Sequence, residues 1–147
     1  MNNALVGIAG VHHVVSELSR RGLIALPTVK NTAAYDIVAI DQLGTWHANI
    51  QVKTSSKRAT FFLMPPPEKI RTGRHNYYVL ARWVEAESRY ECYLLRGREA
   101  REAIEATLGR QKASLRRGAR LLPSIHIGRG DGADAMRWAR AWKRWRL

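Results

Sequence analysis

The chain has 147 residues, 46% of them apolar, and 25 lysines and arginines against 12 aspartates and glutamates, a net charge of +13. This balance predicts one domain, residues 1–147, with a proper core. It also predicts an anionic partner, with nucleic acid ahead of a membrane surface. The single cysteine, Cys92, excludes an intrachain disulfide and a cysteine-rich zinc site.

The first predicted element is a helix over Ala4–Arg21. Apolar residues recur three and four positions apart along it, which is typical of one apolar helix face. These residues are Ala4, Ile8, Val11, Val15 and Leu18. Gly22 follows at the place where a glycine commonly ends a helix.

Strands are predicted next, because β-branched and aromatic residues alternate between turn residues. Tyr35–Ile40 and Trp46–Thr54 form a β-hairpin around the turn residues 41–44. Three further strands are expected to join this hairpin in a central mixed sheet: Leu23–Leu26, Tyr77–Val84 and Tyr90–Leu95. Short strands are also expected at residues 61–64 and 124–127.

Two more helices are predicted towards the end of the chain. Arg98–Arg110 carries apolar residues one turn apart, and Ala133–Trp145 carries three tryptophans on one stripe among basic residues. The fold is therefore predicted to be α/β, with the sheet between the first helix and the 98–110 helix and an extra C-terminal helix. The tryptophan stripe fits a buried face or a dimer contact better than a surface that stacks on bases.

Polar residues converge at one end of the hairpin. Alternation along a strand places Gln51 and Lys53 on one face and Val52 on the other, while Asp36 begins the partner strand. A carboxylate, an amide oxygen and an ammonium group at one place are able to hold a divalent cation and activate a water molecule. A solvated hairpin with a lysine at its edge is the alternative interpretation.

The order and spacing of these motifs resemble the PD-(D/E)XK nuclease superfamily, whose fold is of the restriction-endonuclease type. Asp36, followed by Gln51-Val52-Lys53 in the wording IQVKTS, is similar to a small bacterial branch with a Gln-x-Lys motif, which includes an intron-encoded homing endonuclease. The resemblance extends over most of the chain, from the first helix to the helix that follows ECYLLRGREA.

The resemblance implies a metal-dependent DNA endonuclease that hydrolyses phosphodiester bonds. Asp36 and Gln51 would be ligands of Mg²⁺ (or Mn²⁺), and Lys53 would orient or deprotonate the attacking water and stabilise the transition state. We expect no small-molecule cofactor. Most enzymes of this type act as homodimers or higher homo-oligomers, so we expect the same here.

One position departs from the family pattern. The branch has a glutamate in the first helix, after a glycine and eleven residues before the closing glycine, where this chain has Val11. Glu17 is a candidate catalytic substitute, although an exposed residue paired with a nearby arginine is the alternative. His12 and His13 are further possible substitutes. The departure leaves open a DNA-binding protein on the same fold whose metal site has been lost.

Residues around the hairpin and a later basic cluster are candidates for contact with nucleic acid, because hydroxyl and cationic groups bind phosphates. They are Lys30, Asn31, Thr54, Ser55, Lys57, Arg58, Arg116, Arg117 and Arg120. Solvated polar loops are the alternative. RNA as the substrate and a basic protein-interaction module are also open.

The chain is expected to be cytoplasmic. No apolar run reaches the roughly 18 to 20 residues that cross a bilayer, so no membrane association through a spanning segment is expected. The N-terminus has no basic signal region, and one cysteine fits a reducing compartment.

Overall fold

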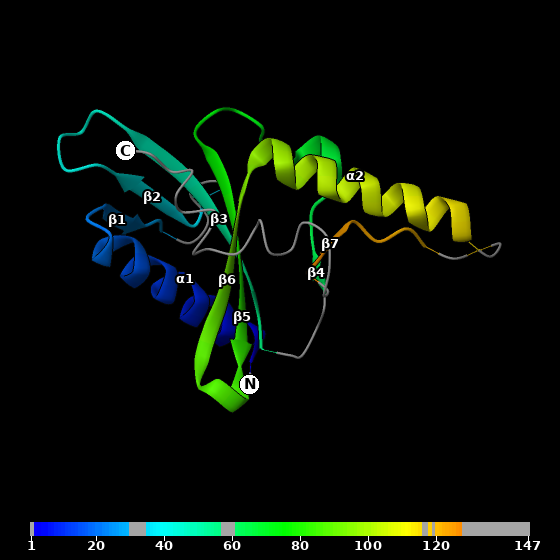
Figure 1. Cartoon of the computed structure of the whole chain (residues 1–147), viewed down its shortest axis with the longest axis horizontal. Coiled ribbons are helices and arrows are strands. Elements are labelled where there is room, and N and C mark those ends of the chain that lie inside the picture. Colours follow the sequence, from blue (N-terminus) through cyan, green and yellow to red (C-terminus); the bar gives the residue numbers. More distant parts are fainter. Residues whose placement is uncertain (1, 30–34, 57–60, 116–117, 119, 128–147) are drawn as a thin grey trace.

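The structure is a computed structural model that describes residues 2–29, 35–56, 61–115, 118 and 120–127 (Figure 1). Its helices are α1 (Asn3–Arg20) and α2 (Gly97–Ser114), with short 3-10 helices η1 (Pro67–Lys69) and η2 (Glu85–Glu87). Its strands are β1 (Ile24–Pro27), β2 (Ile37–Ile40), β3 (His47–Ser55), β4 (Phe61–Leu63), β5 (Asn76–Val84), β6 (Arg89–Arg96) and β7 (Ser124–His126). In this part of the chain no helix has the length and apolar character needed to cross a membrane.

The main sheet has five strands in the order β1-β2-β3-β5-β6. All neighbours are antiparallel except β3 and β5, which run parallel. The predicted mixed central sheet is therefore confirmed, strand for strand. The remaining strands, β4 and β7, pair in a separate two-stranded sheet.

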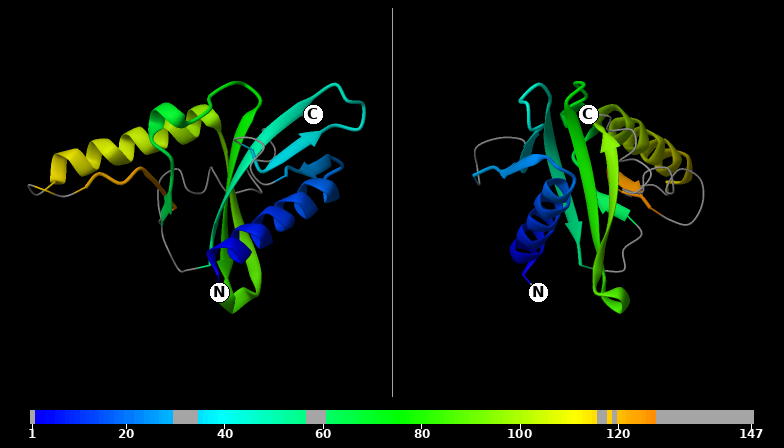
Figure 2. Two further views of the ribbon diagram at one scale, coloured as in Figure 1. Left: turned by 180° about the vertical axis from the view of Figure 1, so that it is seen from behind. Right: turned by 60° about the vertical axis from the view of Figure 1, so that its left-hand side comes forward.

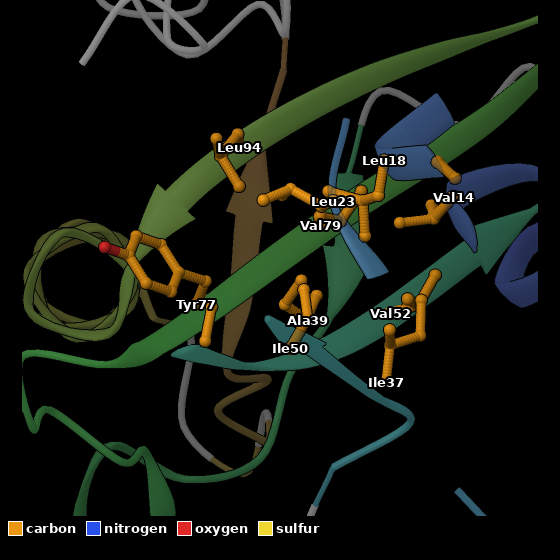
Figure 3. Packing of buried hydrophobic residues seen from close by; sticks show 12 residues of the cluster. Val14, Leu18, Leu23, Ile37, Ala39, Ile50, Val52, Tyr77, Val79 and Leu94 are labelled. Carbon is orange, nitrogen blue, oxygen red and sulfur yellow. The ribbon is translucent and has the colours of Figure 1, made fainter. Parts of the chain in front are cut away.

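The two helices cover opposite faces of the main sheet, as Figure 2 shows. On one face Val14 and Leu18 of α1 pack against β2, β3, β5 and β6 (Figure 3). On the other face Ala100 and Ile104 of α2 pack with β5, β6 and the β4–β7 pair. The predicted placement of the helices on the two faces is confirmed. The predicted C-terminal helix, Ala133–Trp145, lies outside the described residues.

The buried face of α1 differs from the predicted one. It consists of Val6, Gly10, Val14 and Leu18, whereas Ile8 is 51% exposed. The reason is Gly10, where an added Cβ would lie 1.9 Å from Oγ1 of Thr54 on β3. The helix crosses β3 at Gly10. The buried apolar residues therefore lie four or eight positions from Gly10, at Val6, Val14 and Leu18.

The hairpin turn between β2 and β3 is fixed by Asp41. Its carboxylate accepts hydrogen bonds from Thr45 Oγ1 at 2.5 Å and from the Trp46 backbone N–H at 2.9 Å. Gly44 has a φ of +70°, a conformation that side chains rarely adopt. These contacts set the register that pairs Ile40 with His47 and so brings the beginning of β2 beside Ile50 in the middle of β3.

Candidate functional site

Asp36 lies where β2 begins and is bonded to β3 on both sides of Gln51. Its backbone N–H donates to the carbonyl of Ile50 at 2.9 Å. Its Oδ2 accepts from the backbone N–H of Val52 at 2.7 Å. In the described part of the chain no hydrogen bond occupies Oδ1, so this oxygen is available to a ligand. Asp36 and Gln51 are thus adjacent, although they are fifteen positions apart in the sequence.

Gln51 and Lys53 lie on the face of β3 that is turned away from α1. Val52 between them is 9% exposed and belongs to the α1 side of the core (Figure 3). In the parallel register Gln51 is paired with Tyr78 and Lys53 with Leu80, and both partners belong to the cluster on the α2 side. Both side chains are partly exposed. The structure therefore places the three residues of the predicted site at one end of the hairpin.

Three residues that the sequence did not single out stand beside this site. The backbone N–H of Arg71 donates to the hydroxyl of Tyr78 at 3.2 Å. The guanidinium of Arg71 lies 5.0 Å from the ring centre of Tyr35, and its NH1 donates to the Tyr35 hydroxyl at 3.3 Å. Burial raises the pKa of Tyr78, so its hydroxyl stays protonated at neutral pH.

The loop that carries Arg71 is fastened to the start of α2. A Cβ on Gly97 would lie 1.9 Å from the carbonyl oxygen of Arg71, so only glycine fits there. Arg101 of α2 donates from Nε to the carbonyl of Pro67 at 3.1 Å and from NH2 to that of Ile70 at 2.8 Å. These two hydrogen bonds join residues 34 and 31 positions apart in the chain. Local sequence periodicity cannot predict contacts between residues so far apart.

Glu17 lies apart from the three hairpin residues. Its carboxylate pairs with Arg21 at 2.5 Å and with Arg20 at 3.6 Å, and the hydrogen bond from Arg21 lowers its pKa. Burial raises the pKa of Cys92 on β6 to about 12, and the nearby Glu17 carboxylate adds to the rise. Glu17 thus lies over the β6 edge on the α1 face, whereas Gln51 and Lys53 point to the other face. This placement fits the ion-pair alternative rather than a substitute metal ligand.

The other first-helix candidates also lie on the α1 side. Val11, where the predicted family pattern has glutamate, is partly buried against the core cluster. The ring of His13 stacks on Tyr90 of β6 at 4.7 Å between centres, and His12 is exposed. Neither histidine pairs with a residue of the hairpin end in the described part of the chain.

The candidates for contact with nucleic acid fall in three groups. Thr54 is turned towards α1, and its Oγ1 is buried beneath Gly10, a placement that does not fit the predicted phosphate contact. Ser55 is partly exposed at the end of β3, and Arg120 is exposed. The others lie outside the described residues: Lys30, Asn31, Lys57, Arg58, Arg116 and Arg117.

The donor set at the hairpin end suits a hard cation that keeps much of its water. Among the described residues, no group of three or more His, Cys, Asp or Glu side chains is placed to hold a metal ion. One carboxylate oxygen of Asp36 and the amide oxygen of Gln51 are oxygen donors of the kind that Mg²⁺ binds while it retains several waters. The residues present therefore fit Mg²⁺ or Mn²⁺ and do not fit a zinc site.

Comparison with known proteins supports the fold. The solved structure of a bacterial homing endonuclease, I-Ssp6803I, superposes with a TM-score of 0.58 over 97% of this chain and 90% of that chain, at 15% sequence identity. No known protein family matches the sequence, and no curated protein matches it significantly. At this identity the likeness establishes the fold: an α/β chain with a five-stranded mixed sheet flanked by helices, shared with a homing endonuclease.

Proposed function

We propose that the protein is a metal-dependent DNA endonuclease of the PD-(D/E)XK type, which hydrolyses phosphodiester bonds at the end of the β2–β3 hairpin. The observation that carries the proposal is Asp36, which bonds to β3 on both sides of Gln51 at 2.9 and 2.7 Å. Its support comes from the positive charge of the chain and from a fold like that of a homing endonuclease.

In this proposal the chain's own residues divide the work at the site. Asp36 and Gln51 would hold Mg²⁺ or Mn²⁺, which when bound supplies Lewis-acid stabilisation of the phosphate and lowers the pKa of bound water. Lys53, on the same face as Gln51, orients the attacking water and offsets the negative charge that develops on the phosphate oxygens. The hydrogen bond from Val52 to Asp36 fixes the carboxylate before substrate arrives.

We further propose that two or more copies act together on double-stranded DNA. Among the described residues β1 is an outermost strand of the sheet, and it exposes Ile24 at 48% and Leu26 at 51%. Ser55, Arg120 and the basic residues outside the described part of the chain would contact DNA phosphates without reading the sequence.

A second candidate is a DNA-binding protein on this fold that no longer cuts. Two observations favour it: Val11 stands where the resembled branch has a carboxylate, and the described residues place no group of three or more His, Cys, Asp or Glu side chains to hold a metal. This candidate predicts DNA binding in EDTA and no cleavage with either Mg²⁺ or Mn²⁺.

A plasmid-nicking assay with Mg²⁺ and with Mn²⁺ separates the two candidates. Wild type is compared with Asp36→Asn, which keeps an oxygen acceptor for the Val52 N–H but removes the charge, and with Lys53→Ala. We expect wild type to nick and both variants to lose about a hundredfold or more in rate, since each removes a group that acts in the transition state.

Lys112→Ala is the control for lost charge, because Lys112 is exposed in the last turn of α2, whereas the site residues lie at the hairpin. It should nick at the wild-type rate. If Lys53→Ala also nicks at that rate, the mechanism is wrong. If wild type binds DNA but never nicks, the binding-protein candidate is correct.

A further inference from the structure

We propose that Arg71 binds a phosphate of the DNA strand held at the hairpin end, so that it positions the strand against Asp36, Gln51 and Lys53. The inference rests on the proposed function, and it deepens that function by assigning a phosphate contact beside Tyr35, next to Asp36. It is carried by the two tyrosine contacts that hold Arg71 over the sheet.

The position of Arg71 follows from the register of three neighbouring strands. Tyr78 on β5 is paired with Gln51 on β3, and Tyr35 directly precedes Asp36, which is bonded to β3 beside Gln51. Arg71 contacts Tyr78 through its backbone and Tyr35 through its guanidinium. Adjacent strands lie about 4.8 Å apart, and Gln51 lies between Tyr35 and Tyr78 across the sheet. Arg71 therefore spans roughly 10 Å above Gln51.

The backbone of Arg71 is held before any ligand binds. Its N–H is bonded to Tyr78, its carbonyl fits against Gly97, and the residue before it, Ile70, accepts a hydrogen bond from Arg101. Ile70 itself is 2% exposed. An arginine on a fastened loop loses less conformational freedom when it binds a phosphate than one on a free loop.

The positive charge of Arg71 is not paired with a carboxylate of the described residues, so it can attract an anionic ligand. The ion pairs of the described residues occupy Arg20, Arg21, Arg82 and Arg89, and none involves Arg71, whose side chain is exposed. Its polar side-chain partner is instead the neutral hydroxyl of Tyr35. A tyrosine orients the guanidinium through its ring and hydroxyl without neutralising it.

The chemistry of the guanidinium selects the ligand. Arginine presents five N–H donors in a planar fork, of which the bond to Tyr35 uses one. The remaining donors fit the two oxygens of a phosphodiester in a bidentate contact. A DNA backbone passing over Gln51 would bring a phosphate to this fork.

The test measures binding and cutting separately. Binding of a fluorescent duplex is followed in EDTA at several salt concentrations for wild type, Arg71→Ala and Arg71→Lys. We expect Arg71→Ala to weaken binding and to reduce the slope of log affinity against log salt by about 1, since one phosphate contact is lost. Arg71→Lys should keep the slope, since the charge remains.

The rate of single-turnover nicking at saturating protein then measures how well the bound DNA strand is positioned at the site. Arg71→Ala should lower the rate by about 10- to 100-fold, and Arg71→Lys should recover it only in part, since lysine cannot form the bidentate contact. Arg89→Ala is the matched control, because Arg89 is exposed but already paired with Glu87 and Glu91. It should change neither the slope nor the rate.

The outcomes distinguish this inference from the proposed function. If Arg71→Ala keeps the wild-type slope and affinity, or loses only thermal stability, Arg71 is a brace of the loop and the inference is wrong. If wild type does not cut but Arg71→Ala lowers the slope, the nuclease proposal fails while the phosphate contact stands. A wild type that binds no DNA overturns both.

Discussion

The burial of His13 makes the stability of the folded protein depend on pH. Its ring stacks on Tyr90 at 4.7 Å, and burial lowers its pKa below the ordinary value for histidine. The nearby Glu17 carboxylate opposes this shift and Arg21 adds to it. The unfolded chain therefore binds a proton at His13 more readily than the folded chain does, and acid favours unfolding at this position.

We predict that the free energy of unfolding of the wild type falls as the pH drops from about 6.5, the ordinary pKa of histidine, to about 5. His13→Gln should flatten this part of the profile, and the exposed His12→Gln should leave it unchanged. Urea unfolding at each pH measures the effect. Measurements stop at about pH 5 because the carboxylate of Glu17, whose pKa is lowered by Arg21, contributes its own loss in stronger acid. Equal profiles for wild type and His13→Gln would contradict the prediction.

At the residue scale, the sequence predicted the positions of the site residues that belong to one hairpin. Strand alternation and spacing predicted that Asp36, Gln51 and Lys53 lie together, and the structure places Asp36, at the beginning of β2, beside Gln51 of β3. Arg71 could not be found in this way, because its contact with Tyr35 joins residues 36 positions apart. Such contacts depend on how the loop after β4 returns over the sheet.

At the scale of elements, α1 crosses β3 closely at Gly10. Val14 and Leu18 are 0% exposed, and each contributes roughly 1.5 to 3 kcal/mol by burial. Their burial depends on Gly10, which lets the helix approach Thr54 more closely than any residue with a side chain would. Helical periodicity alone predicted that the face next to the observed one is buried. A glycine has no apolar side chain, so Gly10 did not contribute to the pattern.

We predict that Gly10→Ala destabilises the protein by about 1 to 3 kcal/mol, because the new methyl group would overlap the buried Thr54 side chain, its nearest atom at 1.9 Å. Gly7→Ala is the matched control on the same helix, with no atom within 4 Å of the added Cβ. Since alanine is the better helix former, Gly7→Ala should stabilise by about 0.5 to 1 kcal/mol. Urea midpoints for the two variants should therefore shift in opposite directions, and shifts in the same direction would refute the crossing as described.

The strands were more predictable than the helices. Turn residues bounded them closely: the hairpin strand predicted as Trp46–Thr54 is His47–Ser55 in the structure. The second helix was predicted to end at Arg110 but continues to Ser114, because its polar last turn carries no apolar signal while Gln111 bonds to the backbone of Leu122. Local polarity could not report this tertiary contact.

At the scale of the whole molecule, the charge of +13 has a measurable consequence for binding. We predict that affinity for duplex DNA falls about 10³- to 10⁵-fold between 50 and 200 mM salt, as expected for roughly 6 to 10 phosphate contacts. Anisotropy titrations with two duplexes of unrelated sequence test this, and both should give the same slope. A salt-independent affinity would exclude backbone contacts as the main source of binding.

The parallel pair β3–β5 also determines when the site is complete. It is the one parallel pair among the described strands, and it joins Asn49 to Asn76, across a long excursion of the chain through β4 and η1. The residues proposed to hold the metal lie before this excursion, whereas Arg71, which is proposed to bind the phosphate, lies within it and is held by Tyr78 of β5. Contacts so distant in sequence form late, because the intervening loop must close first. If the protein cuts DNA as proposed, a chain emerging from the ribosome would have an incomplete site until β5 docks, so newly made protein would not cut DNA until folding is finished.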